Sequence, residues 1–599
     1  MPTHPLVRSV VLIALAFTLV ATALLAYLSL AGSRPAMQDR YVTERENRPD
    51  PFRLRGCLDL ALGTDPCNPG STSASLPPHA AHLLNSVYAY ASAKRGHSPN
   101  TRVLGATPEV SSPIMQGRNV QLTLQASEQD LAQTTADCYT GNTRACQRCH
   151  WCNTSKASSM FEGARARSLG LLVLDAQTGA IEAAASAYTA CFAQQQRGEH
   201  PGTGCPELPN QLVPHLDRLG NQSLEQTAKL GSLTKIGIAL ALQQTDLSAA
   251  EAAALPNILT HSLTLPLIDI VMCKARGFDT QCAQARLTAI ANMAQALGWR
   301  GQQADVLSAG QIPGLSALRF TARFMHNADG SALTSVPLAL NRQALQACSQ
   351  RAWHQCAGLD LGRLVPELFG TGEALASPFG VSNALLHLAA AANAQSAVSQ
   401  AHLVQSAQDD NAKPLTPQAF RRPAVTKAQA DAVIQGLIPG ATIGTARSAC
   451  LAAATAWPGG LLPCAAKANS PSALRIAGKT GTSVFSTDQG KNISLPLPQW
   501  RARCSRFAQA LESSGSNKSN RYILKNEVRK CNMQPTKLYA FMVSKPGSSR
   551  WERIVVVFSE RNWNQHTQLI DSPNDRGSNV AAEAGLAFAN ALYHPKVQP

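Results

Sequence analysis

The sequence predicts an α+β domain in which a central antiparallel sheet is flanked by helices. Apolar and alternating runs typical of strands occur at residues 168–184 and again at 475–483 and 537–558. Between them, residues 223–405 form a block rich in alanine and leucine with helical periodicity. A helical pattern returns at residues 578–593, where Ser578 is the expected N-cap. One sheet assembled from distant parts of the chain accounts for this order.

The expected strands form two hairpins and one separate strand. The first hairpin joins residues 168–175 to residues 180–184 through a polar turn that contains glycine. The second joins residues 537–543 to residues 553–558 around a Lys-Pro-Gly turn. Residues 119–124 alternate like a strand and precede a helix whose first turn is acidic.

Composition indicates a globular, basic protein. The chain has 599 residues, of which 45% are hydrophobic and 15% are charged, and its formal net charge is +16. This charge favours anionic neighbours, but no dense basic run and no nucleic-acid motif occurs. We therefore expect a basic protein of the cell envelope, with no nucleic-acid partner and no cofactor.

An uncharged apolar segment near the amino terminus predicts a membrane anchor. Residues 9–33 carry no charge and are bounded by Arg8 and Arg34. The segment is long enough to span a bilayer, whereas the apolar region of a cleaved signal peptide, the alternative, usually has roughly 7–15 residues. We expect a cytoplasmic stub and transmembrane anchor over residues 1–32. A linker with a small cysteine-containing region is expected over 33–160, and the main domain over 161–599.

Cysteines set the expected compartment. The chain has 16 of them, and most fall in close sequential couples that are typical of local disulfides, which persist in an oxidising compartment. The body of the protein is therefore expected outside the cytoplasmic membrane. The couples are Cys57 with Cys67, Cys191 with Cys205, Cys273 with Cys282, Cys348 with Cys356, Cys450 with Cys464, and Cys504 with Cys531.

One cysteine cluster allows two interpretations. Cys138, Cys146, Cys149, His150 and Cys152 have spacings that suit zinc or an iron–sulfur cluster. Outside the cytoplasm, four neighbouring cysteines more often form two disulfides. We assign no metal ligand here, and both interpretations stay open.

A candidate nucleophile lies at the expected start of a helix. In Ser232-Leu233-Thr234-Lys235, the spacing places Lys235 one helical turn after Ser232. A lysine whose pKa is lowered by burial can take the proton of a serine hydroxyl, which is otherwise a weak nucleophile. The alternative is a serine N-cap followed by a solvated lysine.

A second stretch supplies groups for an anion. Lys479-Thr480-Gly481-Thr482 offers a positive charge and two hydroxyls to a carboxylate, and its glycine lets a ligand lie close to a strand edge. The alternative is an edge strand whose lysine discourages aggregation.

Taken together, the two motifs carry a family resemblance. Ser-x-x-Lys followed far downstream by Lys-Thr-Gly is typical of serine acyltransferases that react with penicillin. The chain resembles the transpeptidase domain of membrane-anchored, monofunctional penicillin-binding proteins of class B type. The similarity extends to the hairpin at 170–184 and the segment 379–393, covers residues 119–595, and includes no glycosyltransferase region. It implies a penicillin-binding/serine β-lactamase-like fold over residues 161–599.

The resemblance also implies an activity and roles for individual residues. Ser232 would attack a D-alanyl-D-alanine carbonyl of a peptidoglycan stem peptide, with Lys235 as general base. Backbone N–H groups of Ser232 and Thr482 would form the oxyanion hole. The side chains of Lys479, Thr480 and Thr482, with Gly481 between them, would bind the terminal carboxylate. An amine from a second stem peptide would release the acyl group as a cross-link, or water would release it by carboxypeptidase action.

The same resemblance implies partners and a location. Stem peptides would be the substrates, and β-lactam antibiotics would act as covalent inhibitors. The protein would be a single-pass protein of the cytoplasmic (inner) membrane, with its catalytic domain on the periplasmic side, where it meets other envelope proteins.

Two departures from the family pattern leave other functions open. The middle motif, usually Ser-x-Asn, is matched best by Ser262-Leu263-Thr264, in which Ser262 would relay a proton and Thr264 lacks the amide that binds substrate. Residues 484–536 form a long basic insertion beside the motif strand. The chain could therefore be a catalytically weakened scaffold or β-lactam sensor, or a Ser-x-x-Lys β-lactamase or carboxypeptidase.

Overall fold

The computed structural model describes the core of the chain and parts of its connections. The predicted anchor at 1–32, Ser578, the cysteines from Cys146 to Cys152 and nearly all of the insertion at 484–536 lie outside the described residues. The described residues are 54–55, 120–123, 125–140, 167–188, 223, 228–305, 319–325, 340–351, 359–370, 374–402, 404–408, 414–415, 422–456, 460–465, 472–483, 505–506, 509–510, 513, 536–561 and 579–594.

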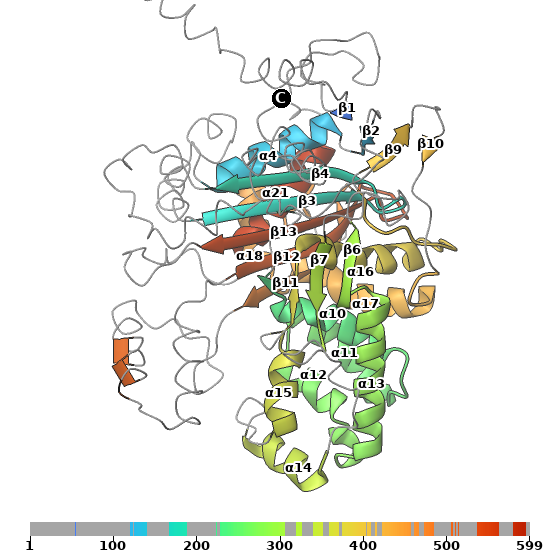
Figure 1. The fold of residues 1–599 in the computed structure, drawn as a ribbon, viewed down its shortest axis with the longest axis vertical. Helices are drawn as coiled ribbons and strands as arrows, with labels where there is room; N and C mark the ends of the chain where they lie inside the picture. The colour runs from blue at the N-terminus through green and yellow to red at the C-terminus, as the bar shows by residue number, and fades with distance from the viewer. Residues whose placement is uncertain are drawn as a thin grey trace, which may run out of the picture.

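A five-stranded antiparallel sheet organises the molecule (Figure 1). Its order is β11-β12-β13-β3-β4, so the last strands of the chain lie between the motif strand and the first hairpin. Both predicted hairpins and the predicted motif strand are confirmed. The strands are β3 (Arg167–Asp175), β4 (Ile181–Tyr188), β11 (Arg475–Ser483), β12 (Thr536–Ser544) and β13 (Arg553–Arg561).

Alternation along the strands builds two hydrophobic cores, one on each face of the sheet. In β13, Ile554 and Val556 face the first core, whereas Val555 and Val557 face the second. Successive side chains of a strand point to opposite faces, so a strand that is apolar throughout requires cover on both sides. The sheet is therefore a buried middle layer, and β11 is one of its two edges.

Helices cover both faces (Figure 1). The first core is shared with the larger set: α10 (Thr234–Leu242), α11 (Ala249–His261), α12 (Thr264–Val271), α13 (Thr280–Ala296), α14 (Arg342–Arg351), α15 (Leu359–Leu368), α16 (Pro378–Ala392) and α17 (Lys427–Leu437). The second core is shared with α4 (Ala126–Tyr139), α18 (Arg447–Ala456) and α21 (Asn579–Tyr593). Short 3₁₀ helices are η3 (Gly231–Leu233), η4 (Lys274–Arg276) and η6 (Ile438–Ala441).

The central block is mostly helical, as predicted for residues 223–405, but it also contains short strands that the sequence did not indicate. It contains β5 (Ala228–Lys229), β6 (Arg300–Asp305), β7 (Arg319–Arg323) and β8 (Leu375–Ala376), which pair in the order β5-β8-β7-β6. The sequences of β6 and β7 are rich in arginine and glutamine and lack the apolar alternation of a half-buried strand. A third sheet pairs β1 (Leu54–Arg55), β2 (Val120–Leu122), β9 (Val404–Gln408) and β10 (Pro414–Leu415).

Two of the predicted disulfides are confirmed. Cys273 bonds to Cys282 after α12, and Cys450 in α18 bonds to Cys464. Cys138 and Cys348 are also disulfide-bonded. For Cys138, this agrees with the disulfide interpretation of its cluster, because a bonded sulfur is no longer a thiolate ligand. The other predicted couples involve cysteines outside the described residues.

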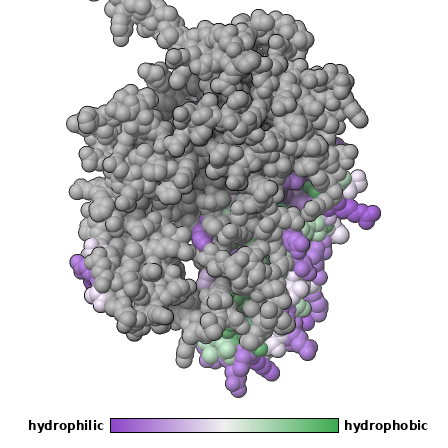
Figure 2. All heavy atoms as spheres, viewed as in Figure 1, coloured by the Kyte–Doolittle hydropathy of each residue, from purple (hydrophilic) through white to green (hydrophobic). Residues whose placement is uncertain are grey.

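On the face that Figure 2 shows, the visible described residues are mainly hydrophilic. In Figure 2, polar residues dominate the region where α13 and α14 lie in Figure 1, beside a smaller hydrophobic area. Large hydrophobic side chains exposed in the described ranges are Leu263, Leu265, Ile438, Ile443 and Leu451. Within those ranges, a helix of the length and apolarity required to cross a bilayer is not found.

Candidate active site

The two motifs meet where the start of α10 packs against β11. Ser232 lies in η3, which runs directly into α10. Gly481 of β11 allows this close packing, since a Cβ at its position would lie 2.8 Å from the carbonyl oxygen of Leu230 and 2.9 Å from Leu233 Cγ. The glycine that sequence analysis assigned to ligand approach therefore also lets the strand reach the segment that carries the nucleophile.

Ser232, Lys235 and Ser262 form one hydrogen-bonded group. Lys235 Nζ donates to Ser232 Oγ at 2.7 Å and to Ser262 Oγ at 3.3 Å. Residues 232 and 235 are one helical turn apart, but Ser262 comes from the C-cap of α11. The lysine amine thus connects the hydroxyls of two separate elements.

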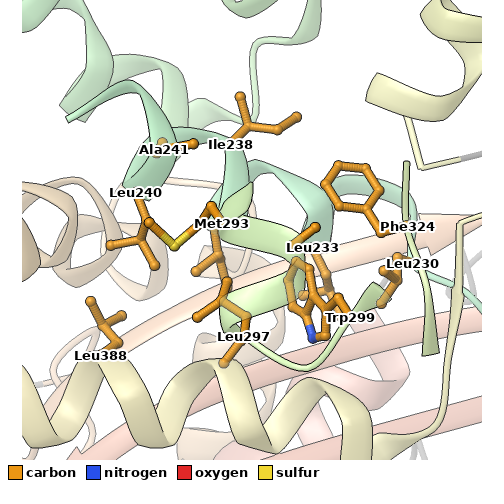
Figure 3. Close-up of a cluster of buried hydrophobic side chains, with 14 of the residues drawn as sticks. Leu230, Leu233, Ile238, Leu240, Ala241, Met293, Leu297, Trp299, Phe324 and Leu388 are labelled. Atoms are coloured by element: carbon orange, nitrogen blue, oxygen red, sulfur yellow. The ribbon is translucent and has the colours of Figure 1, made fainter. Parts of the chain in front are cut away.

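The hydrophobic surroundings of α10 bury Lys235. Every residue of this helix is buried, and Figure 3 shows its Ile238, Leu240 and Ala241 near Met293, Leu297 and Trp299. Gly237 contributes to this packing, because a Cβ there would lie 2.9 Å from the Trp299 ring. Lys235 is only 1% exposed. Removal from water penalises the ammonium form and lowers the pKa of Lys235 to about 7.

Ser262 reaches the lysine through an unusual backbone conformation. It has φ of 56°, in the left-handed region, and ends α11 as its C-cap. Non-glycine residues adopt this conformation at a cost, so the surrounding structure must hold it in place. The N–H of Leu263 donates to Ile258 O at 2.9 Å, which closes the last turn of the helix.

Lys479 lies on the face of β11 that looks towards α10. It lies on the same face of the strand as Ala477, two residues earlier, and Ala477 belongs to the first core. Its side chain is 1% exposed, and its Nζ donates to the carbonyl oxygen of Thr480 at 3.1 Å. Burial, and next the positive charge of Lys235, lower the pKa of Lys479 well below its ordinary value. A bound anion would favour the charged form of Lys479 again.

The remaining predicted residues lie around this group. Thr480 is buried beside Lys479, and the backbone of Thr482 pairs with Lys537 of β12, while the Thr482 side chain is outside the described part of the structure. Thr264 opens α12 and is half-buried. Among the described residues, its side chain makes no hydrogen bond to Ser232, Lys235 or Ser262.

Thr445 is a residue of this region that sequence analysis missed. Its Oγ1 lies 2.6 Å from Thr480 Oγ1, and its backbone N–H donates to Thr260 O at 3.3 Å. It lies between η6 and α18, and η6 packs against β11, since a Cβ on Gly440 would lie 3.1 Å from Gly478 O. No motif marks it, because its position depends on how η6 packs on the sheet.

The arrangement brings together two serine hydroxyls and two buried lysine amines. This set is suited to acyl transfer, in which a serine is deprotonated and an anionic substrate is bound alongside. A group of three or more metal-binding side chains is not found among the described residues.

Comparison with known proteins identifies similar solved structures only. No model of a protein family matches the chain. No curated protein matches it. Similar structures include PBPA from Mycobacterium tuberculosis, at 15% identity and a TM-score of 0.39, covering 80% of this chain and 84% of that one. Penicillin-binding protein 2B from Streptococcus pneumoniae has 12% identity and a TM-score of 0.41, covering 80% and 61%.

A third similar structure is the D,D-transpeptidase domain of a peptidoglycan glycosyltransferase from Eggerthella lenta. Its identity is 15% and its TM-score is 0.38, and the alignment covers 82% of this chain and 89% of that domain. Penicillin-binding proteins are the class that the sequence motifs resemble.

Proposed function

We propose that this chain is a serine D,D-transpeptidase that cross-links peptidoglycan stem peptides through an acyl-enzyme on Ser232. The observation that carries the proposal is the position of Lys235, which is 1% exposed and lies 2.7 Å from Ser232 Oγ and 3.3 Å from Ser262 Oγ. A solvated lysine next to an N-cap serine would be charged at neutral pH. A buried amine with a pKa of about 7 is available as a base.

Acylation begins when neutral Lys235 takes the hydroxyl proton of Ser232. The Ser232 oxygen forms a bond to the carbonyl carbon between the last two D-alanines, and the C–N bond of that peptide breaks. Ser262 passes the proton from Lys235 to the leaving amine, for which its 3.3 Å contact with Nζ is suited. The products are an ester on Ser232 and a free D-alanine.

Two further groups of atoms hold the substrate. The terminal carboxylate binds to Lys479, Thr480 and Thr482, and its negative charge pairs with the Lys479 ammonium. The developing oxyanion accepts hydrogen bonds from the backbone N–H groups of Ser232 and Thr482, a contribution worth about 10²–10³ in rate for one such donor in other enzymes. The start of α10, next to Ser232, adds a favourable dipole.

Release follows the same route in reverse. An amine of a second stem peptide attacks the ester, its proton passes to Lys235 and then to the Ser232 oxygen, and a cross-link forms. Water in place of the amine gives carboxypeptidase action. A β-lactam mimics the acyl donor and leaves Ser232 acylated.

The location of the protein belongs to the same proposal. A single anchor at residues 1–32 would hold the domain at the periplasmic face of the cytoplasmic membrane, where stem peptides and envelope proteins are met. The bonded cysteine pairs Cys273–Cys282 and Cys450–Cys464 support an oxidising compartment. Alkylation of the unreduced protein from the cell should then find few free thiols, and a majority of free thiols would refute this location.

A second candidate is a catalytically weakened scaffold or β-lactam sensor. It is favoured by Thr264, which occupies the position of the usual asparagine and offers no amide to a substrate backbone. A serine β-lactamase of the kind whose middle motif is Ser-x-Val is a related alternative, since Ser262-Leu263-Thr264 is sterically close to that motif. The three functions differ in how fast the acyl-enzyme forms and how fast it is lost.

Labelling with a fluorescent penicillin tests the proposal. We expect a stable adduct on Ser232, located by mass spectrometry of the labelled peptide, and no adduct on the Ser232→Ala variant. If labelling does not depend on Ser232, all of the proposed enzyme activities are ruled out. An adduct that forms and is lost within minutes would instead indicate a β-lactamase. A stable adduct without cross-linking of stem peptides would favour the sensor.

A further inference from the structure

The carboxylate-binding wall contains a hydroxyl pair of which only one member belongs to a motif. Thr480 Oγ1 and Thr445 Oγ1 are 2.6 Å apart, a distance at which one hydroxyl donates to the other. Thr480 is buried and Thr445 is half-buried, so the pair is shielded from much of the solvent. Hydrogen bonds in such an environment are stronger than those exposed to water.

The direction of this hydrogen bond follows from the ligand. A hydroxyl has one hydrogen to donate and two lone pairs, and a carboxylate only accepts. If Thr480 donates its hydrogen to a bound carboxylate, it cannot also donate to Thr445. Thr445 must then be the donor, and this hydrogen bond to the Thr480 oxygen strengthens the one that Thr480 makes to the ligand.

The backbone of the same loop is fastened to the other wall of the site. The N–H of Thr445 donates to Thr260 O at 3.3 Å, two residues before Ser262. The preceding Gly444 permits this contact, because a Cβ there would lie 2.3 Å from the same carbonyl oxygen. Thr260 is itself held, since its Oγ1 donates to Gly436 O at 2.9 Å. Thr445 therefore has a fixed place between β11 and the end of α11.

We propose that Thr445 is a positioning residue that donates to Thr480 and thereby orients and polarises the hydroxyl that binds the carboxylate of the acyl donor. This inference rests on the proposed function. It implies that the site prefers acyl donors that carry a free carboxylate. It also implies that Thr445, a residue outside the Ser-x-x-Lys and Lys-Thr-Gly motifs, contributes to this preference.

The test compares two probes on matched variants. The probes are a fluorescent penicillin with its free carboxylate and the methyl ester of the same penicillin. The variants are Thr445→Val, which keeps the shape and removes the hydroxyl, and Thr445→Ser, which keeps the hydroxyl. Thr442→Val is the control, because Thr442 lies in the same loop and its hydroxyl donates to Pro439 O at 3.2 Å, not to β11.

We expect Thr445→Val to slow acylation by the carboxylate probe by about tenfold or more, the scale of one hydrogen bond supporting a charged group. Most of this loss should appear in the concentration dependence of labelling, which reports binding, and the methyl ester should be affected by less than about twofold. Thr445→Ser should restore the rate to within about threefold, and Thr442→Val should leave both probes unchanged.

Other outcomes overturn the inference. Equal slowing of both probes by Thr445→Val means that the residue only supports the fold of the loop, and no slowing means that Thr480 acts without it. If Thr445→Val does not fold, Thr445→Ala is judged on the same two probes and by the same criteria. Failure of the wild-type protein to label at Ser232 with either probe is a different result, which removes the proposed function and this inference with it.

Discussion

At the scale of single residues, Lys235 shows how burial makes a common side chain suitable for the base that the proposed function requires. The sequence places the amine one helical turn from Ser232, but a lysine in water has a pKa near 10.4 and is protonated at neutral pH. The apolar packing around α10 lowers the pKa of Lys235 to about 7. The cost is a destabilised folded state, which is typical of functional sites.

The pH dependence of acylation follows from this pKa. In the proposed mechanism the neutral amine is the base, so the second-order rate of labelling by penicillin should rise with pH, by up to about tenfold per unit below pH 7, and level off above it. The measurement is the labelling rate across a series of buffers, with unfolding followed in parallel. A rate that stays constant through neutral pH would contradict Lys235 as the base.

Thr264 allows a test of the weakened middle motif in the proposed function. Thr264→Asn places an amide at the first position of α12, from which the proposed function expects a contact with the substrate backbone. One added hydrogen bond to the substrate backbone is worth about 0.5–1.5 kcal/mol, so acylation by a peptide donor should become about 3–10-fold faster. The rate is measured by release of D-alanine. Thr264→Val serves as the control, and an equal gain for both variants would contradict this explanation.

At the scale of elements, a buried ion pair connects α11, which has Ser262 as its C-cap, to the neighbouring helices. Arg286 of α13 donates to both carboxylate oxygens of Glu251 at 2.8 Å, and also to the carbonyl oxygens of Ile270 and Asp246. Its side chain is 1% exposed. Glu251 is the third residue of α11 and completes a capping box with Ser248. Arg286 thus connects α11, α12 and α13.

Removing this arginine should lower the stability of the folded protein. Arg286→Met leaves the Glu251 carboxylate buried without its partner, which costs about 3–5 kcal/mol in free energy of unfolding. Chemical denaturation measures the loss, and the double variant with Glu251→Gln should recover part of it. The hydrogen bond from Arg286 holds the pKa of Glu251 at about 2, so the contribution is present above the ordinary carboxyl pKa and is lost as the pH falls towards 2. An effect smaller than about 1 kcal/mol would contradict the role of the pair.

At the scale of the whole molecule, a charged cluster joins α4 to the distant end of the sheet. Arg553 of β13 pairs with Glu128 of α4 at 3.2 Å, with Asp175 of β3 at 3.4 Å, and with Glu182 of β4. One cation thus faces three carboxyl groups. Burial, followed by the neighbouring Glu128 carboxylate, raises the pKa of Glu182 to about 9. The Glu182 carboxyl therefore holds a proton more readily than an ordinary carboxyl group does.

Replacing Glu182 should change how stability depends on pH. Because the folded pKa of Glu182 exceeds the unfolded value, its contribution is fully present below that unfolded value and is lost as the pH rises towards 9. Glu182→Gln imitates the protonated carboxyl, so it should match the wild type in mild acid and be more stable by about 1–3 kcal/mol in mild alkali. Thermal unfolding at several pH values measures this. Asp431→Asn, at an exposed ion pair with Lys427, should change stability little at any pH.

Much of the architecture was predictable because it depends on local pattern. Both hairpins, the motif strand and the start of α10 follow from apolar runs, turn residues and helical periodicity. The short strands β6 and β7 were missed, since their polar sequences form strands only where they pair with each other and where β7 also pairs with β8. Two disulfides joined close sequential neighbours, as predicted from spacing.

The sequence by itself determined the chemical groups of this protein, and the tertiary structure decided how they are combined. Ser232 and Lys235 are neighbours on one helical turn, so their contact follows from local geometry. Ser262 meets Lys235, and Thr445 meets Thr480, only because α11 and η6 pack against α10 and β11. Such contacts depend on long-range burial, which also lowers the pKa of Lys235, and no local pattern in the chain encodes them.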